Sequence, residues 1–323
     1  MLRQFFMYHT EIGKDIIKAK LLLEKGELVA IPTETVYGLA ANALDPLAVA
    51  KIYEVKNRPQ FNPLIIHVAD IDQLRKYVGA IPDDCIQLMQ AFSPGPITFL
   101  LDKSDLIPDI TTAGSSKVAV RIPNHPLTLQ LLSSLSFPLA APSANPSGYV
   151  SPVRADHVAQ GLLGKIPYIL DGGNSTVGLE STIVGFQDGD TLVHRLGGIA
   201  VEEIEKVLGK AVKISITHDA PKTPGQLKSH YAPRKKLIVG DIEKLITDFS
   251  DKKLGIISFQ HKYPYTIPQI ILSEKGNLAE AASRLFSAMR EMDNFDIDLI
   301  LSEWVPEEGV GRAINDRLRK ASH

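Results

Sequence analysis

Short apolar runs alternate with helical segments along most of this chain, and one proline-rich stretch interrupts the alternation. That stretch, residues 217–233, contains three prolines and shows little hydrophobic periodicity. Because proline restricts the backbone and lacks an amide donor, such a stretch is typical of an extended linker. The chain has 323 residues, which is more than one ordinary core needs. We therefore expect two units, residues 1–209 and 234–323, joined by a linker over 210–233.

The first unit is expected to be α/β (α+β), because short apolar runs predict strands and 3.6-residue spacing predicts helices. The expected strands are 28–31, 64–68, 99–101, 118–121, 139–141, 168–170, 181–184 and 192–195. The expected helices are 12–26, one that begins at Asp45-Pro46, 82–92, 126–133, 155–163 and 201–208. Short Gly- and Pro-rich junctions favour a mixed sheet over a regular doubly wound one. The order of the strands does not follow from these patterns.

The second unit repeats the alternation on a smaller scale. Its expected strands are 237–239, 254–259, 270–272 and 299–302, and its expected helices are 242–249, 278–292 and 313–320. About 90 residues are enough for a small independent α/β domain.

Composition excludes several classes of protein. The chain is 44% hydrophobic and 22% charged, as globular proteins are. Its formal net charge of −2 argues against a protein whose main task is to coat nucleic acid. The single cysteine, Cys85, rules out an internal disulfide and a cysteine-rich zinc site. No apolar run approaches the ~20 residues that span a bilayer, and the N-terminus lacks the features of a signal peptide. We therefore expect a cytoplasmic protein.

Two cations mark the first candidate site. Lys56 and Arg58 lie one residue apart in a turn, and Asn62 and His67 follow them closely. Arginine offers a planar fork and lysine a point charge, so the pair suits phosphate or carboxylate oxygens. Each pattern taken alone is more typical of a solvated loop or of a histidine at a strand end.

Two loops and two strand ends add further candidates. Residues 140–148 leave a strand with small side chains, hydroxyls and an amide, which lets a ligand approach the backbone closely. Residues 171–183 form a glycine-rich loop that enters a strand, unlike the phosphate loops that open into a helix. Arg121 and Arg195 each close a β-rich run. A surface loop or an edge strand would show the same residues.

The candidate residues are cations, hydroxyls and amides. The sequence shows no Gly-x-Ser-x-Gly context for a serine triad and no His/Glu cluster with zinc spacing. Such a set fits chemistry by positioning and charge stabilisation, with the reactive groups supplied by the substrates.

Taken together, these motifs resemble the Sua5/YrdC family, the L-threonylcarbamoyladenylate synthases. The motifs of the first unit are Pro32-Thr33-Glu34-Thr35, Lys56-x-Arg58, Pro94-Gly95-Pro96-Ile97-Thr98, Val118-Ala119-Val120-Arg121-Ile122-Pro123, Ala141-Pro142-Ser143-Ala144-Asn145 and Gly178-Leu179-Glu180-Ser181-Thr182. Two further stretches resemble the Sua5 branch of the family: residues 224–233 (Pro-Gly-Gln-Leu-Lys-Ser-His-Tyr-Ala-Pro) and residues 311–318 (Gly-Arg-Ala-Ile-Asn-Asp-Arg-Leu). Gln226-Leu227 departs from that branch, which often has Met followed by Lys or Arg there.

The resemblance implies a YrdC-like twisted mixed sheet with a deep cavity in 1–209, a linker or lid over the active site in 210–233, and a Rossmann-like α/β Sua5 domain in 234–323. It implies a nucleotidyltransferase that condenses L-threonine, bicarbonate or CO2 and ATP to threonylcarbamoyl-AMP and pyrophosphate, with Mg2+ carried by ATP. The product would pass to a tRNA-modifying transferase complex that forms threonylcarbamoyladenosine at position 37. A weak contact with tRNA is also implied, and no contact with a membrane is expected.

The resemblance also assigns residues. The L-threonine ligands are expected to be Thr35, His67, Arg121, Ala141 and Ser181. The ATP ligands are expected to be Arg58, Asn62, Lys117, Ser143, Ser151, Arg195 and Tyr231. The reacting centre is expected to hold Lys56, Arg58, Ser143 and Asn145. No metal ligand is assigned.

Three other interpretations were weighed. A module that binds RNA on a basic concave surface, without turnover, would show strongly salt-dependent phosphate binding. A carbamoyltransferase-type enzyme of hydrogenase maturation would carry cysteine-rich zinc segments, which a single cysteine excludes. A purely structural protein leaves the paired cations unexplained.

Overall fold

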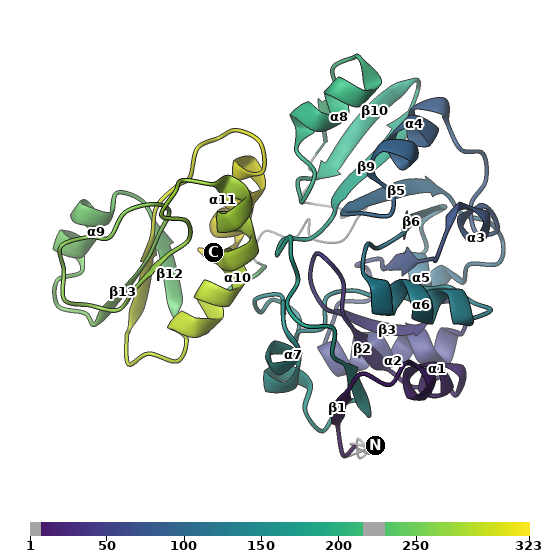
Figure 1. Ribbon diagram of the computed structural model, residues 1–323, viewed down its shortest axis with the longest axis horizontal. Helices are drawn as coiled ribbons and strands as arrows, with labels where there is room; N and C mark the ends of the chain where they lie inside the picture. The colour runs from purple at the N-terminus through teal and green to yellow at the C-terminus, as the bar shows by residue number, and fades with distance from the viewer. Residues whose placement is uncertain (1–7, 216–229) are drawn as a thin grey trace.

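The computed structural model describes residues 8–215 and 230–323, which form two sheets with helices packed around them (Figure 1). The large sheet has eleven strands in the order β1-β8-β2-β3-β7-β4-β6-β5-β9-β10-β11, and the small sheet has four in the order β12-β15-β13-β14. In Figure 1 the small unit lies on the left, and its helices α10 (Leu278–Met292) and α11 (Gly311–Ala321) face the large unit. None of the helices in these described residues has the length and apolar composition to cross a membrane.

The large sheet mixes parallel and antiparallel pairs, as the sequence predicted. Its strands are β1 (Glu11–Gly13), β2 (Val29–Ile31), β3 (Gly38–Asn42), β4 (Ile65–His67), β5 (Ile97–Asp102), β6 (Lys117–Arg121), β7 (Leu139–Ala140), β8 (Tyr168–Leu170), β9 (Thr182–Gln187), β10 (Asp190–Arg195) and β11 (Lys213–Ile214). Strand β4 pairs in parallel with β6 and antiparallel with β7. This arrangement brings the end of β4 beside the end of β6, where the candidate site begins.

Helices cover the large sheet. They are α1 (Ile16–Glu24), α2 (Pro46–Lys56), α3 (Ile71–Arg75), α4 (Asp83–Phe92), α5 (Asp109–Thr112), α6 (Pro126–Ser134), α7 (Ala155–Leu162) and α8 (Val201–Leu208). Helix α2 begins where the Asp45 side chain accepts a hydrogen bond from the Leu47 amide, with a proline in the first turn. It ends at Asn57, whose backbone is left-handed (φ 53°). That ending turns the chain sharply between the cations Lys56 and Arg58.

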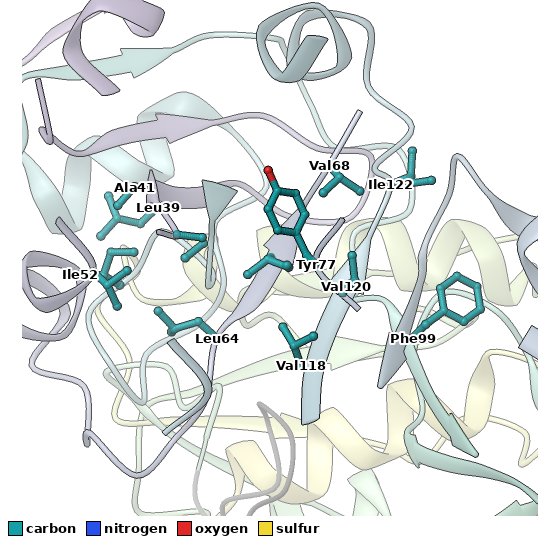
Figure 2. Close-up of a cluster of buried hydrophobic side chains, with 14 of the residues drawn as sticks. Leu39, Ala41, Ile52, Leu64, Val68, Tyr77, Phe99, Val118, Val120 and Ile122 are labelled. Carbon is teal, nitrogen blue, oxygen red and sulfur yellow. The ribbon is translucent and has the colours of Figure 1, made fainter. Parts of the chain in front are cut away.

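An apolar core lies between the large sheet and its helices. Figure 2 shows Leu39 of β3, Val118 and Val120 of β6 and Phe99 of β5 in one cluster, with Ile52 of α2 near Leu39. Each of these side chains is buried. Burying a side chain of this size stabilises the fold by about 1.5–3 kcal/mol, so the core holds rigid the strand ends that carry the site.

The small unit is a parallel α/β sheet. Its elements are β12 (Lys236–Val239), α9 (Ile242–Asp248), β13 (Leu254–Ser258), β14 (Gln269–Ile271), α10, β15 (Leu299–Ser302) and α11. All three strand pairs are parallel. Helices α10 and α11 lie on one side of the sheet and α9 on the other (Figure 1). This topology agrees with the expected Rossmann-like unit.

The structure differs from the expected elements at two places that affect the site. Strand β3 was not predicted, because its sequence Gly-Leu-Ala-Ala-Asn is poor in β-branched residues. Strand β11 pairs with β10, so the large sheet continues to Ile214, beyond residue 209 and into the segment expected to be linker. Residues 216–229 of that segment lie outside the described residues.

Replacing a core aromatic should weaken the large unit without touching the site. Phe99 is 1% exposed on β5, so we expect Phe99→Ala to lower the free energy of unfolding by about 3–5 kcal/mol through lost burial and a cavity. Urea titration followed by circular dichroism measures this. Phe61→Ala, at a side chain that is 59% exposed, is the matched control and should change little. Equal losses in the two variants would contradict this description of the core.

Candidate active site

The candidate site forms where strand ends meet two loops. His67 at the end of β4 lies opposite Arg121 at the end of β6 in the parallel register. The loop after β2 brings Thr35 to the same place, since the Thr35 hydroxyl accepts a hydrogen bond from Arg121 Nη1 at 2.8 Å. Ligands in α/β sheets bind at the carboxyl ends of strands. Candidate residues from separate loops and strand ends of the sequence therefore lie together at one place.

A partly open cavity of about 50 Å³ lies at this place. Most of its lining residues carry polar side chains, and they come from the large unit and from the end of the segment expected to be linker. The lining residues are Thr33, Thr35, Val36, Gly38, Arg58, Ile65, His67, Arg121, Ala141, Pro142, Ser143, Glu180, Ser181, Arg195, His230 and Tyr231. Such a volume holds a few water molecules.

Arg121 is held at its strand end by three contacts. Its Nε donates to the Gly95 carbonyl at 3.2 Å, and its Nη1 donates to Thr35. Its Nη2 lies 2.6 Å from Glu34 Oε1, and both side chains are buried. A buried guanidinium needs such partners because its desolvation is costly. The fork is thereby aimed at the cavity, with Glu34 as its carboxylate partner.

Lys56 and Arg58 are fixed by backbone carbonyls. Lys56 Nζ donates to the Ser143 carbonyl at 2.5 Å and also to the Asn145 carbonyl. Arg58 donates to the carbonyls of Asn62 at 3.1 Å and Pro63 at 2.8 Å. Burial, and next the neighbouring Arg58, lower the pKa of Lys56 well below its usual range. Burial lowers the pKa of Arg58 to about 10, so its guanidinium stays charged at neutral pH.

Arg195 reaches the cavity from the end of β10. Its Nε and Nη2 donate to the carbonyl and to the hydroxyl of Ser181, both at 3.0 Å. The Ser181 hydroxyl also shares a 2.7 Å hydrogen bond with Thr98. Burial lowers the pKa of Arg195 to about 10. This guanidinium is also charged at neutral pH, and it orients the serine hydroxyl.

Glu180 lines the cavity and joins the two units. Its Oε1 accepts the Ser151 hydroxyl at 2.6 Å, and its Oε2 accepts Arg317 Nε of α11 at 2.9 Å. Burial alone would raise the pKa of Glu180, but Arg317, Arg195 and the Ser151 hydroxyl lower it to about 2. The carboxylate is therefore ionised at neutral pH.

Several buried polar atoms at the site lack a hydrogen-bond partner within the described residues. They include Asn62 Oδ1, His67 Nδ1, Asn145 Oδ1 and His230 Nδ1. Burial, helped by Arg121, lowers the pKa of His67 to about 3, and burial lowers that of His230 to about 3. Both imidazoles are thus neutral at pH 7. Buried atoms of this kind usually have a partner, so their clustering indicates a place for a ligand.

Most of the residues assigned from the sequence come together here. Those that line the cavity are Thr35, Arg58, His67, Arg121, Ala141, Ser143, Ser181, Arg195 and Tyr231. Lys56, Asn62, Asn145 and Ser151 are buried just behind it through the contacts given above.

Lys117 is not brought to the cavity. It lies at the opposite end of β6 from Arg121, about 13 Å away at the usual rise per residue. Its side chain is 38% exposed and pairs with Asp102 at 3.1 Å. The reason is geometric, because a strand of five residues cannot present both of its ends to one pocket.

Glu34, Glu180, His230 and Arg317 contact the site although no role was assigned to them. All four lie inside the motifs quoted above, and this was the sequence signal that could have marked them as site residues. Their partners could not be derived, because the pair Glu180–Arg317 is separated by 137 positions and the sequence does not give strand order.

The start of the small unit covers the cavity. Tyr231 is buried with its ring stacked on Phe286 of α10 at a centroid distance of 5.5 Å. The guanidinium of Arg317 lies 5.0 Å from the centre of the Tyr231 ring. His230 packs against the same tyrosine. The cover is therefore held by aromatic and cation–π contacts with both helices.

Comparison with known proteins adds independent findings. The family model described as telomere recombination matches residues 21–197, and the model described as threonylcarbamoyl-AMP synthase, C-terminal domain, matches residues 199–323. Threonylcarbamoyl-AMP synthase of Pyrococcus abyssi is 43% identical and covers 93% of this chain and 92% of its own. That of Bacillus subtilis is 41% identical, with 95% and 92% covered. The crystal structure of P. abyssi Sua5 complexed with L-threonine has a TM-score of 0.91 at 41% identity, covering 97% of each chain.

The depressed pKa of Glu180 predicts a pH-dependent contribution to stability. Its pKa of about 2 lies below the ordinary value of 4.5, so the unfolded chain binds the proton more readily. The contribution, roughly 3 kcal/mol, is complete above pH 4.5 and is lost as the pH falls toward 2. We expect Glu180→Gln to lower stability most at pH 7, with a deficit that shrinks by roughly 2 kcal/mol at pH 3.

Urea midpoints of the parent and the variant between pH 7 and pH 3 measure this difference. Glu54→Gln, at an exposed position of α2, serves as the control, and its difference from the parent should stay constant. A Glu180→Gln deficit that does not change with pH would refute the assignment.

Proposed function

Because the chain belongs to the Sua5/YrdC family, we propose that it acts as a threonylcarbamoyl-AMP synthase, which joins L-threonine, bicarbonate or CO2 and ATP and releases pyrophosphate. The observation that carries the proposal is the cavity in which the guanidinium groups of Arg58, Arg121 and Arg195 converge with small hydroxyls. Three cations buried together suit substrates that carry a carboxylate and a triphosphate. The P. abyssi Sua5 structure complexed with L-threonine supports threonine as the amino acid.

We propose that threonine occupies the side of the cavity at the ends of β4 and β6. Arg121 would bind its carboxylate with the Thr35 hydroxyl beside it, since the two side chains are already hydrogen-bonded. Neutral His67 and the Ser181 hydroxyl would contact the amine and hydroxyl, together with the Ala141 backbone. A neutral imidazole suits this role because its unprotonated nitrogen can accept a hydrogen bond from an ammonium or a hydroxyl group.

We propose that ATP lies on the side of Arg58 and Arg195. Both guanidinium groups stay charged at neutral pH, and the arginine fork matches phosphate oxygens. Asn62, Ser143, Ser151 and Tyr231 would complete the nucleotide contacts. Lys117 stays a prediction from the resemblance alone, since its side chain pairs with Asp102.

Mg2+ is proposed to arrive with ATP as part of the substrate. No three His, Cys, Asp or Glu side chains gather as metal ligands among residues 8–215 and 230–323, and the cavity lining consists mainly of cations and hydroxyls. Mg2+ commonly keeps several waters and binds substrate phosphates, which fits entry as a chelate of the triphosphate.

The proposed reaction has two steps. The unprotonated threonine amine forms a C–N bond to the carbon of bicarbonate, from which one oxygen leaves as water, or to CO2 with loss of a proton, and either route gives a carbamate. A carbamate oxygen then attacks the α-phosphorus of ATP, and the bond to the β-phosphate oxygen breaks so that pyrophosphate leaves. Arg58 and Lys56 would offset the charge that develops between the two substrates. The protein contributes position and electrostatics, and the substrates contribute every bond that changes.

We further propose that residues 210–233 form the segment that closes over the reacting groups. Of its described parts, β11 belongs to the large sheet, while His230 and Tyr231 line the cavity. Exclusion of water by this segment would protect a labile acyl phosphate product. The product would pass to a tRNA-modifying transferase complex, with at most a weak contact between this chain and tRNA. The compartment that we propose is the cytoplasm, where ATP and tRNA meet.

An RNA-binding surface without turnover finds no support in this geometry. The cations Arg58, Arg121 and Arg195 are buried and do not form an exposed surface. Binding of that kind needs exposed cations along a groove.

Arg58→Ala should lower the rate of adenylate synthesis by about 100-fold, because one preorganised cation is lost from the transition state. The measurement is threonine-dependent pyrophosphate release with ATP and bicarbonate present. Arg154→Ala, which removes an exposed arginine paired with Asp156, is the matched control and should retain the parent rate.

Two results would count against the proposal. Full activity in Arg58→Ala would remove that residue from the site. A parent enzyme that releases no pyrophosphate when threonine, bicarbonate and ATP are all present would refute the function itself.

A further inference from the structure

A buried ion pair connects the small unit to the wall of the candidate active site. Arg317 of α11 is 0% exposed, and its Nε donates to Glu180 Oε2 at 2.9 Å. Glu180 lies in the loop before β9 and lines the cavity. A side chain from the C-terminal helix thus sets the charge of a group in the cavity.

Among the described residues that line the cavity, Glu180 is the carboxylate and three others are guanidinium groups. Arg317 and Arg195 both lower the pKa of Glu180, so two cations act on one acid. Arg317 also donates to Asp316 at 2.6 Å and to the Leu196 carbonyl at 2.9 Å. These contacts fix its guanidinium between the two units.

Simple docking of the two units does not require this arrangement. Arg312, one turn earlier on α11, makes an exposed ion pair with Glu202 at 3.1 Å and also links the small unit to the large one. Removing a guanidinium entirely from water carries a large desolvation cost. A group buried at that cost beside a substrate pocket is better explained by an effect on the pocket.

We propose that Arg317 is a positioning residue for the nucleotide: by pairing with Glu180, it offsets the one carboxylate that, among the described lining residues, faces the incoming triphosphate. The inference rests on the function proposed above. Without Arg317, an ionised Glu180 would stand in a low-dielectric cavity beside the phosphates, where repulsion between like charges is strong. Affinity for ATP therefore depends on the small unit, although the phosphate-binding cations belong to the large one.

The first test measures binding without turnover. The probe is α,β-methylene-ATP, whose reacting bond cannot be cleaved, titrated by calorimetry into the full chain. We expect Arg317→Met to weaken binding by about tenfold or more, because an unpaired negative charge remains. The KM for threonine in the full reaction should change by less than about twofold, since Arg121 is untouched. Arg312→Met is the matched control and should bind the probe like the parent.

The second test separates charge from structure. In the double variant Glu180→Gln with Arg317→Met, the carboxylate that Arg317 offsets in the cavity lining is gone, and Asp316, the other acid that Arg317 contacts, keeps its partner Lys320 at 2.9 Å. We expect it to bind the probe within about threefold of Glu180→Gln alone. This comparison stands even if Arg317→Met by itself fails to fold. Arg317→Lys, which keeps the charge but loses the fork, should recover part of the affinity.

Some outcomes would overturn the inference. These are a double variant much weaker than Glu180→Gln alone, and a loss in Arg312→Met equal to that in Arg317→Met. A purely structural role would also be indicated if Arg317→Met raised the KM values for ATP and for threonine together.

Failure of this inference can be told from failure of the proposed function. Probe binding needs no turnover, so it tests the ion pair even if the parent makes no product. If the parent releases pyrophosphate and Arg317→Met binds the probe equally well, the function stands and the inference about Arg317 is wrong.

Discussion

Burial of several cations around one small cavity is the constraint on which the rest of the site depends. Lys56, Arg58, Arg121 and Arg195 are all buried there. Each loses hydration and is repelled by the others, which is costly unless oxygen atoms are placed around them. The structure supplies these as backbone carbonyls and as two carboxylates, Glu34 and Glu180. The fold therefore has to place those oxygen atoms beside the buried cations.

This requirement explains why the loops of the site have irregular backbones. Carbonyl groups within helices and strands are already hydrogen-bonded, so free ones occur only where regular structure ends. The left-handed Asn57 ends α2 and turns Arg58 toward the carbonyls that follow. The loop at 140–148 was interpreted as letting a ligand approach the backbone closely. In the structure its carbonyls at Ser143 and Asn145 accept hydrogen bonds from Lys56.

How much the sequence predicted depended on whether a feature is local. The helices 201–208 and 278–292 and the strand 168–170 have the predicted bounds, since their hydrophobic periodicity is strong. Strand β3 was missed because glycine and alanine carry no strand signal. Most of the residues assigned from the motif resemblance line the cavity or lie just behind it. Lys117 lies at the other end of β6 from Arg121 and pairs with Asp102, and its role stays a prediction. Glu180–Arg317 is a contact between distant segments, and no local pattern contains it.

The charge balance of such a site must differ between its empty and filled states. A triphosphate brings several negative charges to a cavity where Glu34 and Glu180 already compensate part of the positive charge. If both carboxylates acted on the binding cations alone, they would compete with the ligand. Arg317 resolves this conflict at Glu180, because it adds a cation from outside the binding set and shares the carboxylate with Arg195. A second unit packed against the cavity can supply that cation in a fixed position, which a solvated lysine on the rim could not do.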